Sequence, residues 1–412
     1  MSLTGRAALV ALAGALVVLA SPAPWPTVAA VLGLLAVGVA VDLVRAGSVG
    51  ALRLERGGDT ATRLGEPATV RLAVTNGGSR RVRGVLRDAW PPSAGAGPRT
   101  VALDVPPGER RVVETVLRPT RRGDRLAAGV TVRSVGPLGL AARQGRQAAP
   151  WAVRVLPPFT SRRHLPERLS RLRQLDGQVA VRQRGQGTEF DALRDYVPGD
   201  DVRSIDWRAT ARRQGVVVRT WRPERDRRVV VVLDTGRTSA GRVGDAPRLD
   251  AALDAALLLA ALASRAGDHV DLVAADRVMR ADVEGASRTD VLLRMVQAMA
   301  PLEPELVEAD AGLLVSAAAV EEGLLPVLPA LTRRHVVVLA AVADPRVEEL
   351  ARGRGDAAAV YDAAAAERAR AERRRVTAVL RRRGVEVVDA PPEGLAPAVA
   401  DAYLGLKATG RL

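Results

Sequence analysis

Cysteine is absent from this chain of 412 residues, and lysine, histidine and aromatic residues are scarce. Without cysteine there is no disulfide, no thiol nucleophile and no cysteine-ligated zinc. Lys407 is the only lysine, which excludes a glycine-rich phosphate-binding loop, because that loop needs a lysine after its glycines. The three histidines, His164, His269 and His335, are far apart and form no metal-binding motif.

Positive charge is abundant, and arginine supplies almost all of it. The formal net charge is +15, which we attribute to an arginine-rich composition rather than to nucleic-acid binding. An arginine-rich helix is predicted at residues 363–383, where Glu367 and Glu372 partly balance the charge, as on a solvated helix face. No aromatic residues are interleaved there for base stacking, so no nucleic-acid partner is expected.

Two uncharged apolar runs, residues 7–20 and 27–41, flank a proline-rich joint near the N-terminus. Each approaches the roughly 20 residues of a membrane-spanning helix. Arg6 precedes the first run and Arg45 follows the second, so the positive-inside rule places both ends in the cytoplasm. We therefore predict a transmembrane helical hairpin at residues 1–46, in the cell membrane, with a cytoplasmic soluble part. The alternative is a cleaved signal peptide followed by one anchor.

Residues 50–160 consist of short alternating runs between turn residues, which predict a small antiparallel β-sandwich. Residues 68–75, for example, alternate in polarity and stop at Asn76-Gly77-Gly78, a hairpin or turn signal. No set of polar residues that carries chemistry is evident here. We expect a spacer or a protein-binding module.

Residues 185–221 combine acids, arginines and aromatics more densely than any other stretch. Pro198-Gly199-Asp200 predicts a turn, and either Asp200 or Asp201 is expected to cap a helix from Val202 to about Arg213. The stretch is either a rigid, charge-paired linker or a surface that binds a partner or ligand. The candidate interaction residues are Glu189, Phe190, Arg194, Tyr196, Pro198, Gly199, Asp200, Asp201, Arg203, Asp206, Trp207 and Arg212.

Residues 227–412 alternate between predicted strands and helices, which indicates an α/β domain with a doubly wound sheet. Continuous apolar runs at 228–235 and 335–342 predict buried strands, and 269–274 and 385–389 predict two more. An amphipathic helix follows the first strand, and residues 287–300 are expected to be helical, with Ser287 as the cap. Any site in such a sheet lies at the carboxyl ends of its strands.

Several of these motifs resemble a known family. Gly187-Thr-Glu-Phe190, Pro198-Gly-Asp-Asp201 and Arg203-Ser-Ile-Asp-Trp207 look like the signature of the domain of unknown function 58 family, and Ser134–Leu140 resembles the segment before it. The resemblance implies a membrane-anchored protein with a β domain and a von Willebrand factor A-like domain. Members are often encoded beside MoxR-type AAA+ ATPases. On this basis residues 161–226 are the signature linker and residues 227–412 the A-like domain.

The resembling A-domains coordinate Mg²⁺ through an Asp-x-Ser-x-Ser set after the first strand. In this chain Asp234 and Thr238 match that set, whereas Gly236 lacks the middle hydroxyl. The resemblance therefore implies a degenerate magnesium site at Asp234 and Thr238, since hard cations prefer carboxylate and hydroxyl oxygens. The alternative is that Asp234 only caps the end of its strand.

We expect this protein to be a membrane-anchored scaffold or adaptor, not an enzyme, that docks a cytoplasmic protein through its A-like domain. A MoxR-type AAA+ ATPase is the partner that the resemblance implies. Two alternatives stay open: a metal- or carboxylate-dependent hydrolase that uses the central acids, and an arginine-rich binder of anionic lipid surfaces.

Overall fold

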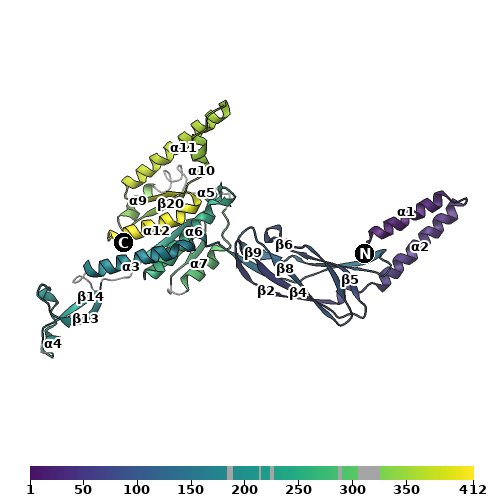
Figure 1. Cartoon of the computed structure of the whole chain (residues 1–412), viewed down its shortest axis with the longest axis horizontal. Helices are drawn as coiled ribbons and strands as arrows, with labels where there is room; N and C mark the ends of the chain where they lie inside the picture. Colours follow the sequence, from purple (N-terminus) through teal and green to yellow (C-terminus); the bar gives the residue numbers. More distant parts are fainter. Residues whose placement is uncertain (183–188, 213–214, 223–226, 286–289, 305–324) are drawn as a thin grey trace. The chain divides into compact units, whose positions relative to one another are not determined.

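A computed structural model of the chain describes residues 1–182, 189–212, 215–222, 227–285, 290–304 and 325–412 (Figure 1). The chain divides into two compact units, Met1–Leu156 and Pro157–Leu412. The first contains apolar helices followed by antiparallel sheets, and the second mixes helices with short sheets. The chain is therefore a mixed α/β protein.

The first unit begins with strand β1 (Ser2–Leu3) and two apolar helices, α1 (Gly5–Leu19) and α2 (Pro24–Arg45), which pack side by side (Figure 1). The Thr4 hydroxyl accepts a hydrogen bond from the amide of Ala7 and caps α1. The apolar stretch Pro24–Ala51 is long enough to cross a membrane, whereas α1 is shorter. Within the described part of the chain, one helix of spanning length thus stands beside a shorter apolar one.

Two antiparallel sheets, with strand orders β1-β11-β10-β5-β7 and β2-β4-β8-β6, form most of the rest of this unit. Their strands are β2 (Leu52–Gly58), β4 (Ala68–Asn76), β5 (Val82–Ala89), β6 (Ala96–Gly97), β7 (Thr100–Val105), β8 (Arg110–Leu117), β10 (Gly129–Val135) and β11 (Ala141–Gln147). A third small sheet joins β3 (Ala61–Arg63), β12 (Ala152–Leu156) and β9 (Gly123–Leu126). We call residues 50–156 the β domain.

The core of the β domain lies between its two larger sheets. Leu72 and Val74 of β4 share one apolar cluster with Leu86 of β5 and Val132 of β10. Successive side chains of a strand point to opposite faces, so the alternation read from residues 68–75 places one face of β4 in this core. The turn after β4 is held by Asn76, whose side-chain oxygen accepts from the amide of Gly78 at 3.0 Å. The predicted antiparallel strands are therefore present.

Among the described residues of the second unit, strands pair in parallel twice. One pair is β15 (Arg228–Asp234) with β18 (His269–Ala275), and the other is β20 (Val338–Val342) with β21 (Glu386–Ala390). The prediction that a strand begins at His335 is wrong, because the amide of His335 donates to the carbonyl of Leu331 and continues the turn that ends a helix. Strand β19 (Met279–Val283) pairs antiparallel with β18 and was not predicted.

In the described part of this unit, helices precede, separate and follow the strands. They are η3 (Thr160–His164), α3 (Leu165–Arg182), α5 (Arg237–Ala240), α6 (Arg248–Arg265), α7 (Val291–Met299), α9 (Leu325–Thr332), α10 (Pro345–Ala351), α11 (Ala357–Arg382) and α12 (Pro392–Ala408), with a small ribbon of β16 (Arg242–Val243) and β17 (Ala246–Pro247) before α6. Leu249, Leu253 and Leu257 are buried along one side of α6, as its periodicity predicts. The expected cap at Ser287 lies outside the described residues.

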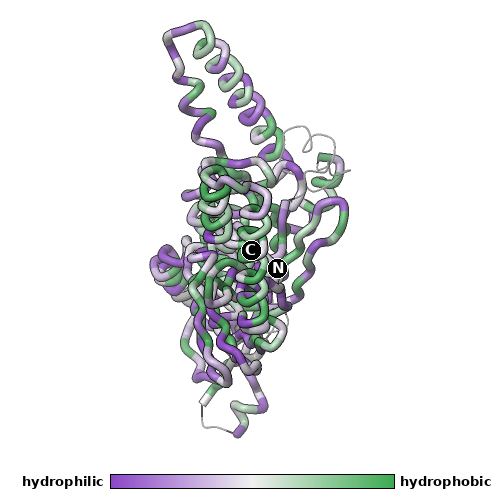
Figure 2. Tube along the Cα trace, turned by 90° about the vertical axis from the view of Figure 1, so that its right-hand side faces the viewer, coloured by the Kyte–Doolittle hydropathy of each residue, from purple (hydrophilic) through white to green (hydrophobic). Residues whose placement is uncertain are grey.

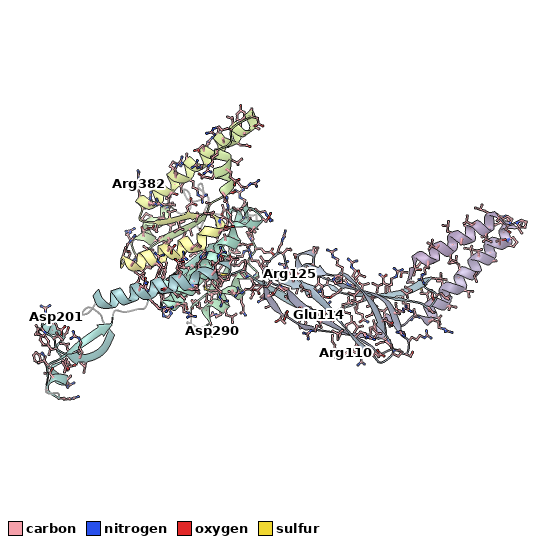
Figure 3. All side chains as sticks on the ribbon, viewed as in Figure 1. Arg110, Glu114, Arg125, Asp201, Asp290 and Arg382 are labelled. Carbon is pink, nitrogen blue, oxygen red and sulfur yellow. The ribbon has the colours of Figure 1, made fainter. Side chains whose placement is uncertain are left out.

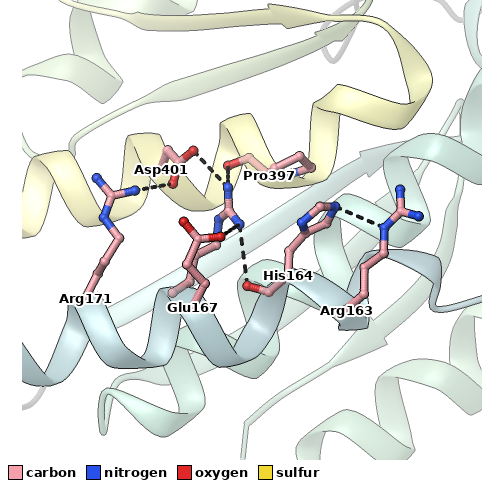
Figure 4. A network of polar contacts seen from close by, with 7 residues as sticks. Arg163, His164, Glu167, Arg171, Pro397 and Asp401 are labelled. Carbon is pink, nitrogen blue, oxygen red and sulfur yellow. Dashed lines mark hydrogen bonds and ion pairs between the residues drawn. The ribbon is translucent and has the colours of Figure 1, made fainter.

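Polar contacts tie α3 to α12, the last helix of the unit (Figure 4). Asp401 accepts hydrogen bonds from Arg168 at 2.9 Å and from Arg171 at 3.1 Å. Asp254 of α6 likewise accepts from the hydroxyls of Thr160 and Ser161 at 2.9 and 3.0 Å. These bonds fix η3 and α3 on the helices of their own unit.

The arginine-rich helix α11 is amphipathic only in part. Its buried residues include Ala363, Val376 and Leu380. Its arginines form ion pairs with acids on the same helix, such as Arg370 with Glu367. At the top of Figure 2, the end of α11 shows hydrophilic and hydrophobic residues interspersed. This distribution is that of a solvated face, as the sequence indicates.

Candidate functional site

The signature residues form an antiparallel hairpin, which we call the signature arm (described residues 189–212 and 215–222). Strand β13 (Glu189–Asp195) pairs with β14 (Val217–Arg222), so that Leu193 faces Arg219 and Asp195 faces Val217. Strand β13 was not predicted from the sequence. The side chains of Glu189 and Phe190 lie outside the described residues.

The predicted turn at Pro198-Gly199 is confirmed. The amide of Asp200 donates to the carbonyl of Val197 at 3.1 Å, and Gly199 occupies the left-handed region with φ of 108°. Proline suits the second position of such a turn and glycine the third, because only glycine adopts this φ without strain. The turn brings the Asp200 carboxylate back over β13.

The Asp200 carboxylate is fully engaged. It accepts two hydrogen bonds from the Arg194 guanidinium, at 2.5 and 2.8 Å, and one from the amide of Val197 at 2.9 Å. The bonds from Arg194, followed by the one from Val197, hold the pKa of Asp200 below its ordinary value. This carboxylate is therefore ionised at neutral pH and fixed in position.

The prediction of one continuous helix from Val202 to about Arg213 is wrong. Asp201 caps a single 3-10 turn, η4 (Val202–Ser204), and Asp206 starts a separate one-turn helix, α4 (Trp207–Thr210) (Figure 3). The helix breaks because Ile205 bridges to Val218 and the amide of Asp206 donates to the carbonyl of Val217. Pairing with β14 thus competes with helix continuation at this point. Of the two possible caps, Asp201 is the one used.

Asp206 links the helix to the strand beside it. Its carboxylate accepts from the amides of Arg208 and Ala209, at 3.0 and 2.9 Å, and from Arg219 of β14 at 2.8 Å. The bond from Ala209, followed by that from Arg219, lowers the pKa of Asp206. Asp206 is therefore a helix cap that also pairs across the arm.

Several apolar side chains of the arm face outward, whereas Val217 and Val218 are buried. Val197, Val202 and Trp207 have exposed fractions of 56%, 63% and 67%, and Tyr196 is also exposed. Arg203 and Arg212 are exposed on the same segment. The arm thus displays several large apolar side chains beside ion pairs that are partly exposed themselves.

Asp234 lies at the carboxyl end of β15, where the resemblance placed a magnesium site. One carboxylate oxygen accepts from the amide of Gly236 at 2.7 Å, and the other accepts from the hydroxyls of Thr238 and Ser239 at 2.6 and 3.0 Å. Both hydroxyls donate hydrogen bonds to Asp234, so the contacts are those of a strand-end cap. Magnesium binding at Asp234 and Thr238 stays a prediction.

Asp276 follows the neighbouring strand β18 and was not predicted from the sequence. Its carboxylate accepts from Thr235 at 2.9 Å, from Arg280 at 2.7 Å and from the amide of Val278 at 3.0 Å. Burial raises the pKa of Asp276, but these hydrogen bonds outweigh it and the pKa is lowered overall. An acid directly after a predicted parallel strand is the signal that marks this position. Among the described residues, no three His, Asp or Glu side chains are grouped to hold a metal ion.

The comparisons with known proteins agree with the motifs. The model of the family described as Protein of unknown function DUF58 matches residues 192–383. Uncharacterized proteins of Mycobacterium tuberculosis and Mycobacterium bovis are 28% identical over 185 residues, which is 40% of this chain and 58% of theirs. The chain therefore matches less than two thirds of these relatives' length, and their names state no function.

Solved structures show only a remote likeness. A crystal structure of the CARDB domain of a Pyrococcus furiosus protein, in complex with di-metal ions, is 19% identical and covers 25% of this chain and 86% of that chain, with a TM-score of 0.20. A solution structure of the same domain is 17% identical and covers 26% of this chain and 94% of that chain, with a TM-score of 0.19. The recognition of the family rests on the signature and on the match over residues 192–383.

Proposed function

We propose, from the premise that residues 192–383 belong to the DUF58 family, that this protein is a membrane-anchored adaptor that docks a cytoplasmic protein partner. The N-terminal helix pair is its transmembrane hairpin, and the C-terminal α/β region is a von Willebrand factor A-like domain. The partner that the family resemblance favours is a MoxR-type AAA+ ATPase. The signature arm supplies the docking surface.

The observation that carries this proposal is the exposure of Trp207 on an arm whose helix start is capped and paired with the neighbouring strand. Exposed tryptophans that are held in place are typical of the few residues that dominate protein binding. Asp206 caps the helix that starts at Trp207, and Arg219 anchors Asp206 in turn. Binding to a rigid surface costs less conformational entropy than binding to a loop that must first become ordered. The ion pairs of the arm therefore favour docking, because they hold its apolar groups in place beforehand.

The same contacts disfavour the hydrolase. A carboxyl group that acts as a general acid at neutral pH needs a raised pKa, and an effective general base needs one near the working pH. The pKa values of Asp200 and Asp206 are both lowered. The carboxylate of Asp201 accepts a hydrogen bond from the amide of Arg203. Structural roles account for all three acids.

The apolar helices support the membrane anchor. Leu9 and Leu12 on α1 and Leu34 and Val37 on α2 are exposed in the structure. Exposure of such side chains to water costs roughly 25 cal/mol for each Å² of apolar surface. Insertion into a bilayer would remove this cost. Arg6 in the first turn of α1 and Arg45 in the last turn of α2 flank the apolar pair, which favours a cytoplasmic location for both ends.

Binding of purified partner to the full chain in nanodiscs tests the proposal. The probe is a MoxR-type ATPase from the same genome, titrated against wild type, Trp207→Ala and Tyr361→Ala. Tyr361 is the matched control, because it is an aromatic residue of α11 with 77% exposure. We expect Trp207→Ala to weaken binding about tenfold or more and Tyr361→Ala to leave it unchanged. Equal affinities of Trp207→Ala and wild type would remove the arm as the docking surface. Absence of binding to wild type would reject this partner.

A further inference from the structure

The last turn of α2 carries a buried carboxylate that is enclosed by the β domain. Asp42 is fully buried. One of its oxygens accepts from the amide of Leu138 at 2.7 Å, and the other accepts from the amides of Leu140 and Ala141 at 2.5 and 2.9 Å. These amides belong to the turn between β10 and β11 and to the first residue of β11. We call the turn, residues 136–140, the collar loop. Three amide donors satisfy a charge that would otherwise be costly at the end of an apolar helix.

The collar loop is built for close contact with α2. A Cβ at Gly136 would lie 2.5 Å from the backbone Cα of Asp42 and would clash with its carboxylate, so only glycine fits at this position. Across the loop, Gly139 adopts φ of 75° and lies against Arg6, at the start of α1. The loop therefore packs closely against both α1 and α2.

Further bonds fix the helices at the same level. Strand β1 pairs Leu3 with Ala141, and the amide of Thr4 donates to the carbonyl of Leu140 at 3.0 Å. Arg143 of β11 donates to the carbonyl of Leu43 at 2.8 Å. The depth of the collar loop along α2 is thus set by hydrogen bonds from three segments of the chain: residues 3–4, the loop itself and β11.

The leucines of the collar loop reach past Asp42 along α2. A Cβ on Gly38 would lie 2.7 Å from a methyl group of Leu140 and 3.8 Å from one of Leu138. Gly38 precedes Asp42 by one helical turn, or about 6 Å along the axis. Leu138 nevertheless has an exposed fraction of 51%. Leu34, which is also exposed, lies one helical turn before Gly38 on α2.

We propose that the collar loop is immersed in the membrane interface and that Leu138 contacts lipid acyl chains. The inference rests on the proposed membrane anchor. Lipid is the occupant because Leu138 lies against Gly38, one helical turn from the exposed Leu34 of α2, and because Arg6 beside the loop and Arg143 at the end of α2 supply positive charge that suits lipid headgroups. The β domain then rests directly on the bilayer without an intervening linker.

Site-directed spin labelling tests this depth, and the natural absence of cysteine allows single labels without background substitutions. The full chain is reconstituted into liposomes with one label at Leu138→Cys, Leu34→Cys or Leu126→Cys. Leu34 reports the middle of α2. Leu126 is the matched control. It is an exposed leucine of β9, which lies in Figure 1 at the end of the β domain opposite α1 and α2. Collisions with oxygen and with a water-soluble nickel complex are compared at each position.

We expect the label at Leu138 to favour oxygen over the nickel complex, as the label at Leu34 does, and the label at Leu126 to favour nickel. If Leu138 behaves like Leu126 while Leu34 favours oxygen, the chain is anchored but the collar loop is in water, and the inference falls alone. If Leu34 itself favours nickel, the anchor falls and the inference falls with it. The labels therefore distinguish failure of the inference from failure of the proposed anchor.

Discussion

The β domain and the signature arm both pair arginine with aspartate, but they do so at opposite levels of exposure. In the β domain, Arg56 and Asp88 form a bidentate pair at 2.5 and 3.0 Å, and their side chains are 1% and 4% exposed. Trp90 adds a hydrogen bond to Asp88, and its ring lies under the guanidinium. In the arm, Arg194 and Asp200 are partly open to solvent.

This difference indicates what each pair is for. A buried ion pair cannot lose one partner without leaving the other as an uncompensated charge, so it ties the β domain to one arrangement. A partly exposed pair contributes little to global stability, because water solvates either partner alone. Its effect is local: Arg194 and Asp200 set the shape of a turn. Substitution of one aspartate in each pair separates the two roles. With the buried Asp42 of α2 as a third case, we expect the loss of stability to be largest for Asp88, smaller for Asp42 and smallest for Asp200.

Asp88→Ala is expected to have the largest effect. It leaves the buried Arg56 without its counter-charge and should lower the free energy of unfolding of the β domain by about 3–5 kcal/mol. Thermal unfolding of the full chain in detergent, followed by tryptophan fluorescence, measures this loss. Asp104→Ala is the control in the same domain, because it removes an exposed pair with Arg81. Equal melting temperatures for the two variants would contradict the prediction.

Asp42→Ala is expected to have an intermediate effect. It removes the acceptor of three amides, those of Leu138, Leu140 and Ala141, and we expect a total loss of about 1–3 kcal/mol, because water that fills the space of the carboxylate can accept from them in part. Hydrogen exchange of the collar loop in the reconstituted protein should speed up, while exchange in β8 should stay as in wild type. Unchanged protection of the three amides would show that the carboxylate does not hold the loop.

Asp200→Asn is expected to affect only the arm. An asparagine accepts fewer charge-assisted bonds from Arg194, so the turn at 197–200 should exchange its amides faster, without a change in the melting temperature of the chain. Loss of partner binding together with an intact melting curve would separate docking from folding. A fall in melting temperature as large as that of Asp88→Ala would remove the contrast between the two regions.

In the neutral range, pH is expected to change the stability of the arm less than any of these substitutions does. Because the pKa values of Asp200 and Asp206 are lower in the folded arm than in the unfolded chain, their ionised forms stabilise it at every pH above the ordinary carboxyl range. This stabilisation is lost only as the pH falls through the lowered pKa values. Carboxyl carbon resonances of both residues should therefore stay constant between about pH 5 and pH 8. A midpoint within that range would contradict the geometry.

Much of the fold follows from local pattern. The alternation of residues 68–75, the periodicity of Leu249, Leu253 and Leu257, and the glycine at position 199 each predict the structure that is observed. These signals work because the side chains that decide them are close in sequence. The break at Ile205 was not predictable in this way, because it depends on pairing with Val218, a residue of another strand further along the chain.

The candidate site shows the same difference between what local sequence predicts and what contacts between distant segments decide. Asp200, Asp201 and Asp206 were recognised as candidates, but the separate duties of Asp200 and Asp206 depend on contacts with Arg194 and Arg219 that spacing alone does not assign. Asp276 was not predicted, because its contact with Thr235 exists only where β15 and β18 lie side by side.

The sequence by itself determined the composition-based exclusions, the apolar N-terminal segments, the antiparallel strands of the β domain and the family signature. Each depends on residue type and local spacing. Only the tertiary structure decided that Asp42 is enclosed by a loop about a hundred positions away and that Trp207 is displayed on a braced arm. Satisfaction of a buried charge and exposure of an apolar group depend on which distant segments meet, and no local pattern encodes that.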